Sequence, residues 1–142
     1  VSGQGNTSAL EEDAAGTDQQ TFGAKKNYFD TARLNRQEAR DSALRLLKEA
    51  AADEKAGQEA IDGANREMQS IAANTLTEST IENLVIAKGY SDCVAFVNNG
   101  SVSVVIAGAG DGLENSDIAK VTDIVMEETG LAADKIKIME AN

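Results

Sequence analysis

The chain lacks most of the side chains that commonly carry catalysis. It contains no histidine, proline or tryptophan, and its only cysteine is Cys93. Without histidine, neither a serine nor a cysteine nucleophile can be paired with a histidine base. One cysteine allows neither an intrachain disulfide nor a zinc cluster. Cys93 lies in an apolar run, so we expect a small buried hydrophobic residue rather than a reactive thiol. We therefore expect no enzyme activity and no catalytic, cofactor or metal site.

Aromatic residues make up only 4% of the chain and hydrophobic residues 42%, which predicts a modest, aliphatic core. The formal net charge is -11, and an acidic chain repels phosphate backbones, so we expect no nucleic-acid partner. No run approaches the about 18 consecutive apolar residues of a membrane-spanning helix. Because the chain begins with Val1 rather than Met, we expect a fragment or processed form, from which an upstream anchor could have been removed.

The composition divides the chain into three parts. Residues 1–21 are polar and acidic and bury too little surface to offset the entropy of ordering, which predicts a disordered acidic tether. Residues 22–75 are rich in good helix formers and predict a helical segment. Residues 76–142 predict a small domain with the element order α-β-β-α-β and a three-stranded sheet. The fold class that we expect is therefore α+β.

Small and apolar residues recur in the helical segment at a spacing of three and four, as in a coiled-coil seam. The row is Phe29, Ala32, Arg36, Ala39, Ala43, Leu46 and Ala50. Because most members are alanine and Arg36 interrupts the row, we favour a helix that packs this stripe on its own domain. We expect a second helix or a bend near residues 53–57, after which Ile61, Ala64, Met68 and Ile71 form a second stripe.

Two shorter helices are expected in the C-terminal domain. One should begin at a cap formed by Thr77 and end at Gly89, which favours the left-handed conformation of a helix terminus. The other should be capped by Ser116 and ended by Gly130. The alternating sequence "DKIKIMEA" then predicts a third strand with its isoleucines facing inward.

A β-hairpin is predicted around Asn99-Gly100, which favours a two-residue turn. In this register one face is wholly apolar and should meet the helices: Cys93, Ala95, Val97, Val102, Val104 and Ile106. We call the opposite, half-apolar set the second hairpin face: Val94, Phe96, Ser103 and Val105. A longer loop would exchange the two faces, because side chains alternate along a strand.

The glycine-rich loop of residues 108–112 is the feature that most resembles a ligand site. Leu113 stands where the dinucleotide fingerprint needs glycine or alanine, and Asp111, Glu114 and Asp117 would repel phosphate. These acids also lack the alternating spacing of an EF-hand calcium loop. We expect a flexible loop, with a small-ligand or nucleotide-binding domain as one alternative. A KH-like RNA-binding domain is another, although its G-x-x-G loop between two helices is absent.

From about Lys26 to its C-terminus, the chain resembles the extracytoplasmic part of the stage III sporulation protein AH family. The resemblance rests on "NYFDTARLNRQEAR" opening a long helix and on "TIENLVIAKGYSD" leading into the hairpin. The late helix "DIAKVTDIVMEETGL" and the strand "KIKIMEA" complete it. The ordered set of segments, rather than any single motif, carries the resemblance.

The resemblance implies an interaction protein of endospore-forming bacteria, with an N-terminal membrane span that this chain does not include. The span would lie in the mother-cell membrane around the forespore, and the soluble part would lie between the two membranes. There it would bind the LytM-like domain of stage II sporulation protein Q and help to build a channel complex. The α-β-β-α-β region is similar to ring-building domains of type III secretion systems, which associate side by side. The family has no catalytic residues to carry over.

Two surfaces are candidate partner contacts. We expect the second hairpin face, or the edge of its strand, to contact a partner or a neighbouring protomer. The alternative is that the long N-terminal helix covers this face within the chain. The second candidate is a basic stripe of Arg33, Arg36 and Arg40, which could meet an acidic surface. For this stripe a solvated helix face is the favoured alternative.

Overall fold

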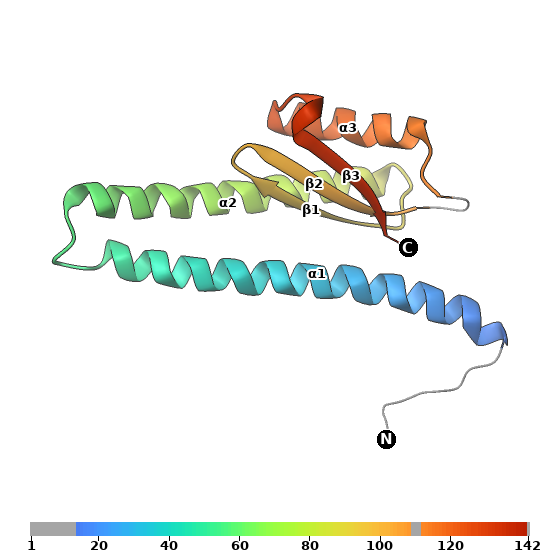
Figure 1. Cartoon of the computed structure of the whole chain (residues 1–142), viewed down its shortest axis with the longest axis horizontal. Helices are drawn as coiled ribbons and strands as arrows, with labels where there is room; N and C mark the ends of the chain where they lie inside the picture. The colour runs from blue at the N-terminus through green and yellow to red at the C-terminus, as the bar shows by residue number, and fades with distance from the viewer. Residues whose placement is uncertain (1–13, 109–111, 142) are drawn as a thin grey trace, which may run out of the picture.

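The computed structural model describes the backbone of residues 14–108 and 112–141, and the side chains from residue 26 onward within these ranges. The first part of the predicted tether, residues 1–13, and loop residues 109–111 lie outside the described residues. Three α-helices and a three-stranded mixed sheet form the described fold (Figure 1). The predicted α+β class is therefore confirmed.

Two long helices run antiparallel, side by side, and extend beyond the sheet (Figure 1). They are α1 (Ala14–Ala51) and α2 (Gln58–Ala87), and the bend expected between them is present. α1 begins earlier than predicted, so assigning residues 14–21 to a disordered tether is wrong. The physical reason is that a helix, once nucleated, extends at low cost through residues such as Ala14 and Ala15.

The expectation that a new helix begins at Thr77 is wrong, because α2 continues through this residue to Ala87. Neighbouring threonines bond back into the helix instead of capping it. The hydroxyl of Thr75 donates to the carbonyl of Ile71 at 2.8 Å, and a threonine can satisfy its hydroxyl in this way inside a helix. The predicted terminator is confirmed, since Gly89 has a φ of 109°. The proposed boundary between residues 75 and 76 therefore lies within one continuous helix.

The sheet consists of β1 (Asp92–Asn98), β2 (Ser101–Ala107) and β3 (Ile136–Ala141), in the order β1-β2-β3. β1 and β2 are antiparallel, and β3 is parallel to β2. The register places Val97 opposite Val102, so the predicted hairpin register is confirmed. β2 is the central strand, and β1 and β3 are the two edges.

α3 (Asn115–Thr129) and a short 3-10 helix, η2 (Ala133–Lys135), carry the chain from β2 to β3. The expected cap at Ser116 is wrong, because the N-cap is Glu114, two residues earlier, and Ser116 lies within the helix. The backbone N–H of Glu114 donates to the carboxylate of Asp117 at 2.8 Å, which fixes the first turn. Gly130 ends the helix with a φ of 74°, as predicted.

The main core lies between the apolar hairpin face and the inner sides of α2 and α3. Its largest buried members are aliphatic: Ile81, Val85, Val102, Val104, Ile106, Val121 and Val125. Ile136 and Ile138 of β3 pack against this core, as predicted. Cys93 is fully buried within it, and this burial raises the pKa of the thiol to about 12. The sequence-based expectation that Cys93 is a buried hydrophobic residue is confirmed.

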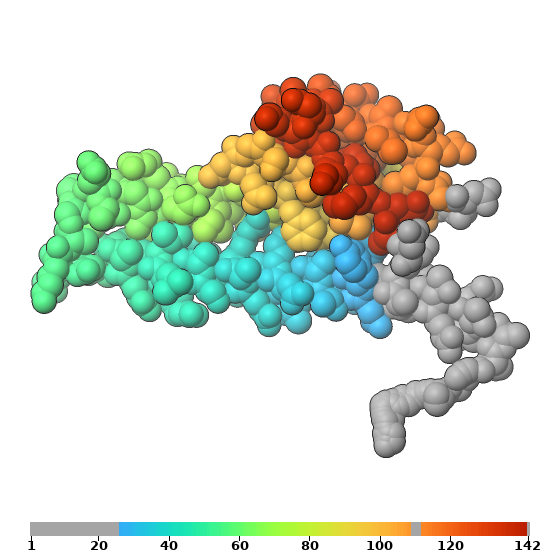
Figure 2. All heavy atoms as spheres, viewed as in Figure 1, coloured from blue at the N-terminus to red at the C-terminus, as the bar shows by residue number. Residues whose placement is uncertain are grey.

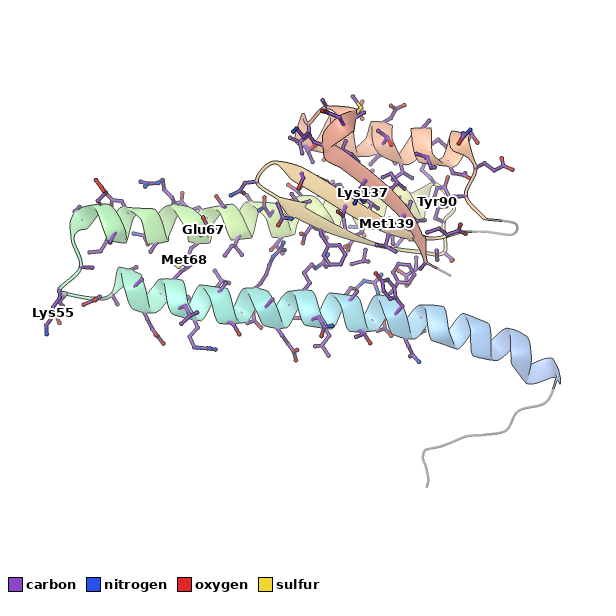
Figure 3. All side chains as sticks on the ribbon, in the orientation of Figure 1. Lys55, Glu67, Met68, Tyr90, Lys137 and Met139 are labelled. Carbon is purple, nitrogen blue, oxygen red and sulfur yellow. The ribbon has the colours of Figure 1, made fainter. Side chains whose placement is uncertain are left out.

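A hydrogen bond joins the start of the sheet to the start of α3. The hydroxyl of Tyr90 donates to the carboxylate of Asp117 at 2.6 Å, and Tyr90, labelled in Figure 3, is almost fully buried. The main cause that raises the pKa of Tyr90 to about 12 is burial, and the bond to Asp117 is the second cause. The same bond is the main cause that lowers the pKa of Asp117 below its ordinary 3.8, and the hydrogen bond from the Glu114 amide is the second.

Tyr90→Phe should destabilise the protein by an amount that depends on pH. The ionised Asp117 stabilises the fold above pH 3.8, and this contribution is lost as the pH falls through its lower folded pKa. The neutral Tyr90 stabilises the fold below pH 10.0, and this contribution is lost as the pH rises towards about 12. Urea unfolding should give a constant wild-type advantage between these limits and a smaller one at both extremes. Exposed Tyr28 is the control, and a Tyr28→Phe variant with the same pH profile would contradict the assignment.

Candidate interaction site

Three arginines of α1 bind the outer edge of β1. Each guanidinium donates to one backbone carbonyl, and the three carbonyls belong to alternate residues of the strand. The pairs are Arg33 to Cys93 at 3.0 Å, Arg36 to Ala95 at 2.5 Å and Arg40 to Val97 at 3.5 Å. Three to four residues of helix rise about 5 Å, and two residues of strand rise about 6.6 Å. The arginine spacing on α1 therefore follows the strand closely enough for long side chains to reach each carbonyl.

Carboxylates bind the amide groups of the same three strand residues. The amide of Cys93 donates to Asp92 at 2.8 Å, that of Ala95 to Glu82 at 2.8 Å and that of Val97 to Glu78 at 2.7 Å. These residues point their backbone groups away from β2, so without the side chains the groups would form an open strand edge. Charged side chains thus close this edge, as they do on many edge strands.

The carboxylates and the arginines also pair with one another. Glu78 is fully buried, and Arg40 binds it through both of its carboxylate oxygens, with Nη2 to Oε2 at 2.6 Å. Arg36 binds Glu82 at 2.7 Å and lies 3.4 Å from Glu78. Arg33 pairs with Asp92. We call the six residues the arginine–carboxylate ladder: Arg33, Arg36, Arg40, Glu78, Glu82 and Asp92.

The ladder explains where the predicted basic stripe lies. Arg33, Arg36 and Arg40 do meet an acidic surface, but this surface belongs to α2 and β1 of the same chain. The favoured alternative, a solvated face, is therefore wrong. The arginines are only partly exposed, so an external partner could reach them only at their outer sides.

α1 also covers half of the second hairpin face. Val94 and Val105 are buried in a small cluster with Phe29 of α1, whose ring lies under the Arg33 guanidinium at 5.9 Å. Phe96 packs against the cluster and is partly exposed, and Ser103 is also partly exposed. The intramolecular alternative therefore describes Val94 and Val105, which α1 covers through Phe29. Phe96 and Ser103 remain accessible in part, and a partner contact at this face stays a prediction.

The inward face of α1 differs from the predicted seam. Leu46 is 60% exposed, whereas Arg36, Arg40 and Leu44 face the groove between the two helices. A helical period near 3.6 residues that includes the charged residues describes this face better than the coiled-coil period.

The acidic ladder residues were missed as functional residues. Glu78 and Glu82, four residues apart, repeat the spacing of the arginines, and that match is the signal that could have found them.

The β3 side of the sheet is open. Lys137 is exposed and Met139 is 39% exposed, and both lie on the sheet face that carries Val105 (Figure 3). Figure 2 shows α1 in contact with the hairpin, while β3 remains visible beside it. In the described part of the chain, no side chain binds the backbone of β3 as the ladder binds β1. The sheet therefore has one closed edge and one open edge.

The glycine-rich loop shows the opposite of a phosphate site at its described ends. Glu140 accepts a hydrogen bond from the amide of Leu113 at 3.3 Å, and its carboxylate faces Gly108 and Gly112. A carboxylate at this position repels phosphate. No cluster of three or more possible metal ligands occurs among the described residues. Gly110 and Asp111 of this loop lie outside the described residues.

Among the helices that the structure describes, none is long and apolar enough to cross a membrane.

The geometry defines an α+β module in which a helical hairpin closes one edge of a three-stranded sheet and leaves the other edge open. The chain belongs to the SpoIIIAH-like protein family, whose model matches residues 2–138. The family resemblance inferred from the sequence is thereby confirmed. Family membership supports an interaction or assembly role and a non-catalytic module.

Two solved structures are similar to the chain, and the first shares its fold. A chain in the structure of the SpoIIQ–SpoIIIAH pore forming complex has a TM-score of 0.67 and 17% identity, and the match covers 80% of this chain and 98% of that chain. EscJ, a type III secretion system protein of enteropathogenic E. coli, has a TM-score of 0.48 and 18% identity, over 63% of this chain and 60% of EscJ. No curated protein matches the chain.

Arg40→Met should destabilise the protein strongly. It removes the guanidinium that binds both oxygens of fully buried Glu78 and leaves only Arg36, at 3.4 Å, and the amide of Val97 as its partners. Losing hydrogen bonds to a buried charged group costs roughly 2 kcal/mol or more. Lys26→Met is the matched control, because its ion pair with Asp30 is exposed and such pairs contribute about 0.5 kcal/mol. Denaturant unfolding measures both. Equal losses in the two variants would show that the ladder does not hold the fold together.

Proposed function

We propose that the chain is a non-catalytic interaction and assembly module, the extracytoplasmic part of a mother-cell membrane protein. In this proposal it binds the LytM-like domain of stage II sporulation protein Q and forms an intermembrane channel complex during sporulation. Family membership supports the proposal, as does the fold shared with a chain of the SpoIIQ–SpoIIIAH complex. Side-by-side association of several copies into a ring belongs to the same proposal.

The observation that carries the proposal is the difference between the two sheet edges. The outward backbone groups of Cys93, Ala95 and Val97 are bound within the chain, so the β1 edge has no free groups there for a partner strand. The β3 side offers the exposed side chains of Lys137 and Met139 beside an edge strand. Sheet edges are a common place for one protein to bind another. We therefore assign the partner contact to the β3 side.

The nucleotide-binding alternative has less support. Glu140 faces the glycines at both described ends of the loop. The net charge of -11 adds to the repulsion of phosphate and of RNA. A protein partner with a basic or neutral surface agrees better with this charge.

Met139→Asp should weaken binding of the Q ectodomain by tenfold or more, which corresponds to about 1.4 kcal/mol. The change places a charge in the proposed contact, and the side chain is already partly exposed, so the fold should persist. Met126→Asp on α3 is the matched control, because Met126 is 38% exposed and Met139 is 39% exposed. Calorimetric titration of the purified chains gives the dissociation constants. Equal constants for the two variants would move the contact elsewhere, and a wild-type chain that does not bind Q would refute the partner.

A further inference from the structure

We infer that α1 can leave its own chain and dock on a second copy, so that two copies exchange their first helices. We call residues 58–141, which comprise α2, the sheet and α3, the head. The inference deepens the proposed assembly function on which it rests. It names the partner surface as the site that α1 covers, and the partner as α1 of another copy.

The contact between α1 and the head depends on few side chains. Between residues 26 and 51, Phe29 is the one buried side chain of α1. The other specific contacts are the ladder arginines, which bind charged groups and strand carbonyls. Such contacts are directional and sequence-specific, but they bury little apolar surface. A second helix with one aromatic residue and three arginines at the same spacing would satisfy the head equally well.

The exposed head would be an unsatisfied surface without α1. Val94 and Val105 would lose their cover, and fully buried Glu78 would lose the guanidinium that pairs it. The outer carbonyls of β1 would also lose their donors. Only a segment with the apolar and guanidinium groups of α1 can satisfy all of these groups. The α1 helix of a second copy has the same sequence and therefore meets this requirement.

The loop between α1 and α2 is suited to opening. It comprises residues 52–57, contains good helix formers and no proline, and is held by few bonds. The amide of Ala56 donates to the carbonyl of Asp53 at 3.1 Å, and the amide of Lys55 donates to the Asp53 carboxylate at 2.9 Å. If the loop becomes helical, α1 and α2 form one continuous helix, and the ends of both helices gain backbone hydrogen bonds.

The position of the loop determines where α1 would go. The loop lies at the end of the helical hairpin that is farthest from the sheet (Figure 1), and Lys55 marks it in Figure 3. Straightening it would carry α1 away from its own head, at about 1.5 Å per residue. Two such chains, related by a twofold axis near their loops, would lie antiparallel. Each α1 would then run along the α2 of its partner, in the same relative direction as within one chain.

Exchange preserves every contact between α1 and the head. The equilibrium between the monomer and the exchanged dimer therefore depends on the conformation of the loop and on the protein concentration. Each copy would cover the sheet of the other through Phe29 and the ladder. A closed twofold dimer results, which is a common outcome when a terminal element is exchanged across a short hinge. In this way two neighbouring heads would be tied together without using the open β3 side.

Loop variants test the inference directly. Ala56 donates to Asp53 across a turn whose second residue is Glu54, a position that favours proline. Glu54→Pro should therefore preserve the bent loop and forbid the continuous helix. The pair Asp53→Ala and Gly57→Ala should favour the helix. Light scattering on a concentration series should show at least a fivefold lower dimer fraction for the proline variant, and a higher one for the alanine pair. The same dimer fraction in both would overturn the inference.

A charge exchange tests whether α1 docks in trans. Arg33→Glu and Asp92→Arg each oppose like charges within one chain, at a pair that is partly exposed and therefore tolerant. In a mixture, the first helix of each variant matches only the head of the other. Native mass spectrometry should show the mixed dimer at least fivefold above the statistical expectation, with the preference reduced in concentrated salt. A chain carrying both changes pairs internally and is the control. A statistical distribution would overturn the inference.

The two proposals fail separately. The exchange assays use this chain alone, so their result does not depend on the Q ectodomain. Glu54→Pro should still bind Q with the wild-type dissociation constant, because the β3 side is unchanged. If the loop variants change the dimer fraction but Q does not bind, the exchange stands and the proposed partner is wrong. If Q binds and no variant changes the dimer fraction, the exchange is wrong and the partner stands.

Discussion

The fold depends on satisfying the outward backbone groups of β1. An edge strand presents N–H and C=O groups that must bind water or another chain, or else be covered. Here α1 supplies guanidinium donors and α2 with Asp92 supplies carboxylate acceptors, in register with Cys93, Ala95 and Val97. Glu78 can therefore be fully buried, because Arg40 and the amide of Val97 bind its oxygens.

This solution makes the two sides of the sheet unequal. On the β1 side, helices, ladder and strand form a continuous hydrogen-bonded layer, so an added strand would have to displace the arginines. On the β3 side, exposed Lys137 and Met139 lie next to an uncapped edge. In the proposed assembly, this asymmetry would direct association to the β3 side, in a module whose family membership supports an assembly role. Uncontrolled pairing at both edges would instead lead to aggregation.

The sequence predicts the hairpin well because its determinants are local. The Asn99-Gly100 turn fixes the register, and alternation then places Cys93 inward and Val94 on the opposite face. The ladder could not be predicted in the same way. Charged residues such as Arg36 and Glu78 are normally assigned to solvent, and only their positions in space show that they pair. The wrong prediction that a helix begins at Thr77 has a similar cause. Residues that can cap a helix also occur inside helices, and here α2 continues on both sides of Thr77.

The charged character of the α1 contact has a consequence for assembly. A buried ion pair adds little net stability compared with an apolar contact of similar size, but breaking it on one side is costly. An alternative partner is therefore accepted only if it presents the same charges at the same spacing. Phe29 adds a single apolar anchor, and its neighbour Arg33 continues the ladder from the same helix. The contact between α1 and the head is thus more selective than it is strong, and selectivity without great strength is what a reversible assembly contact requires.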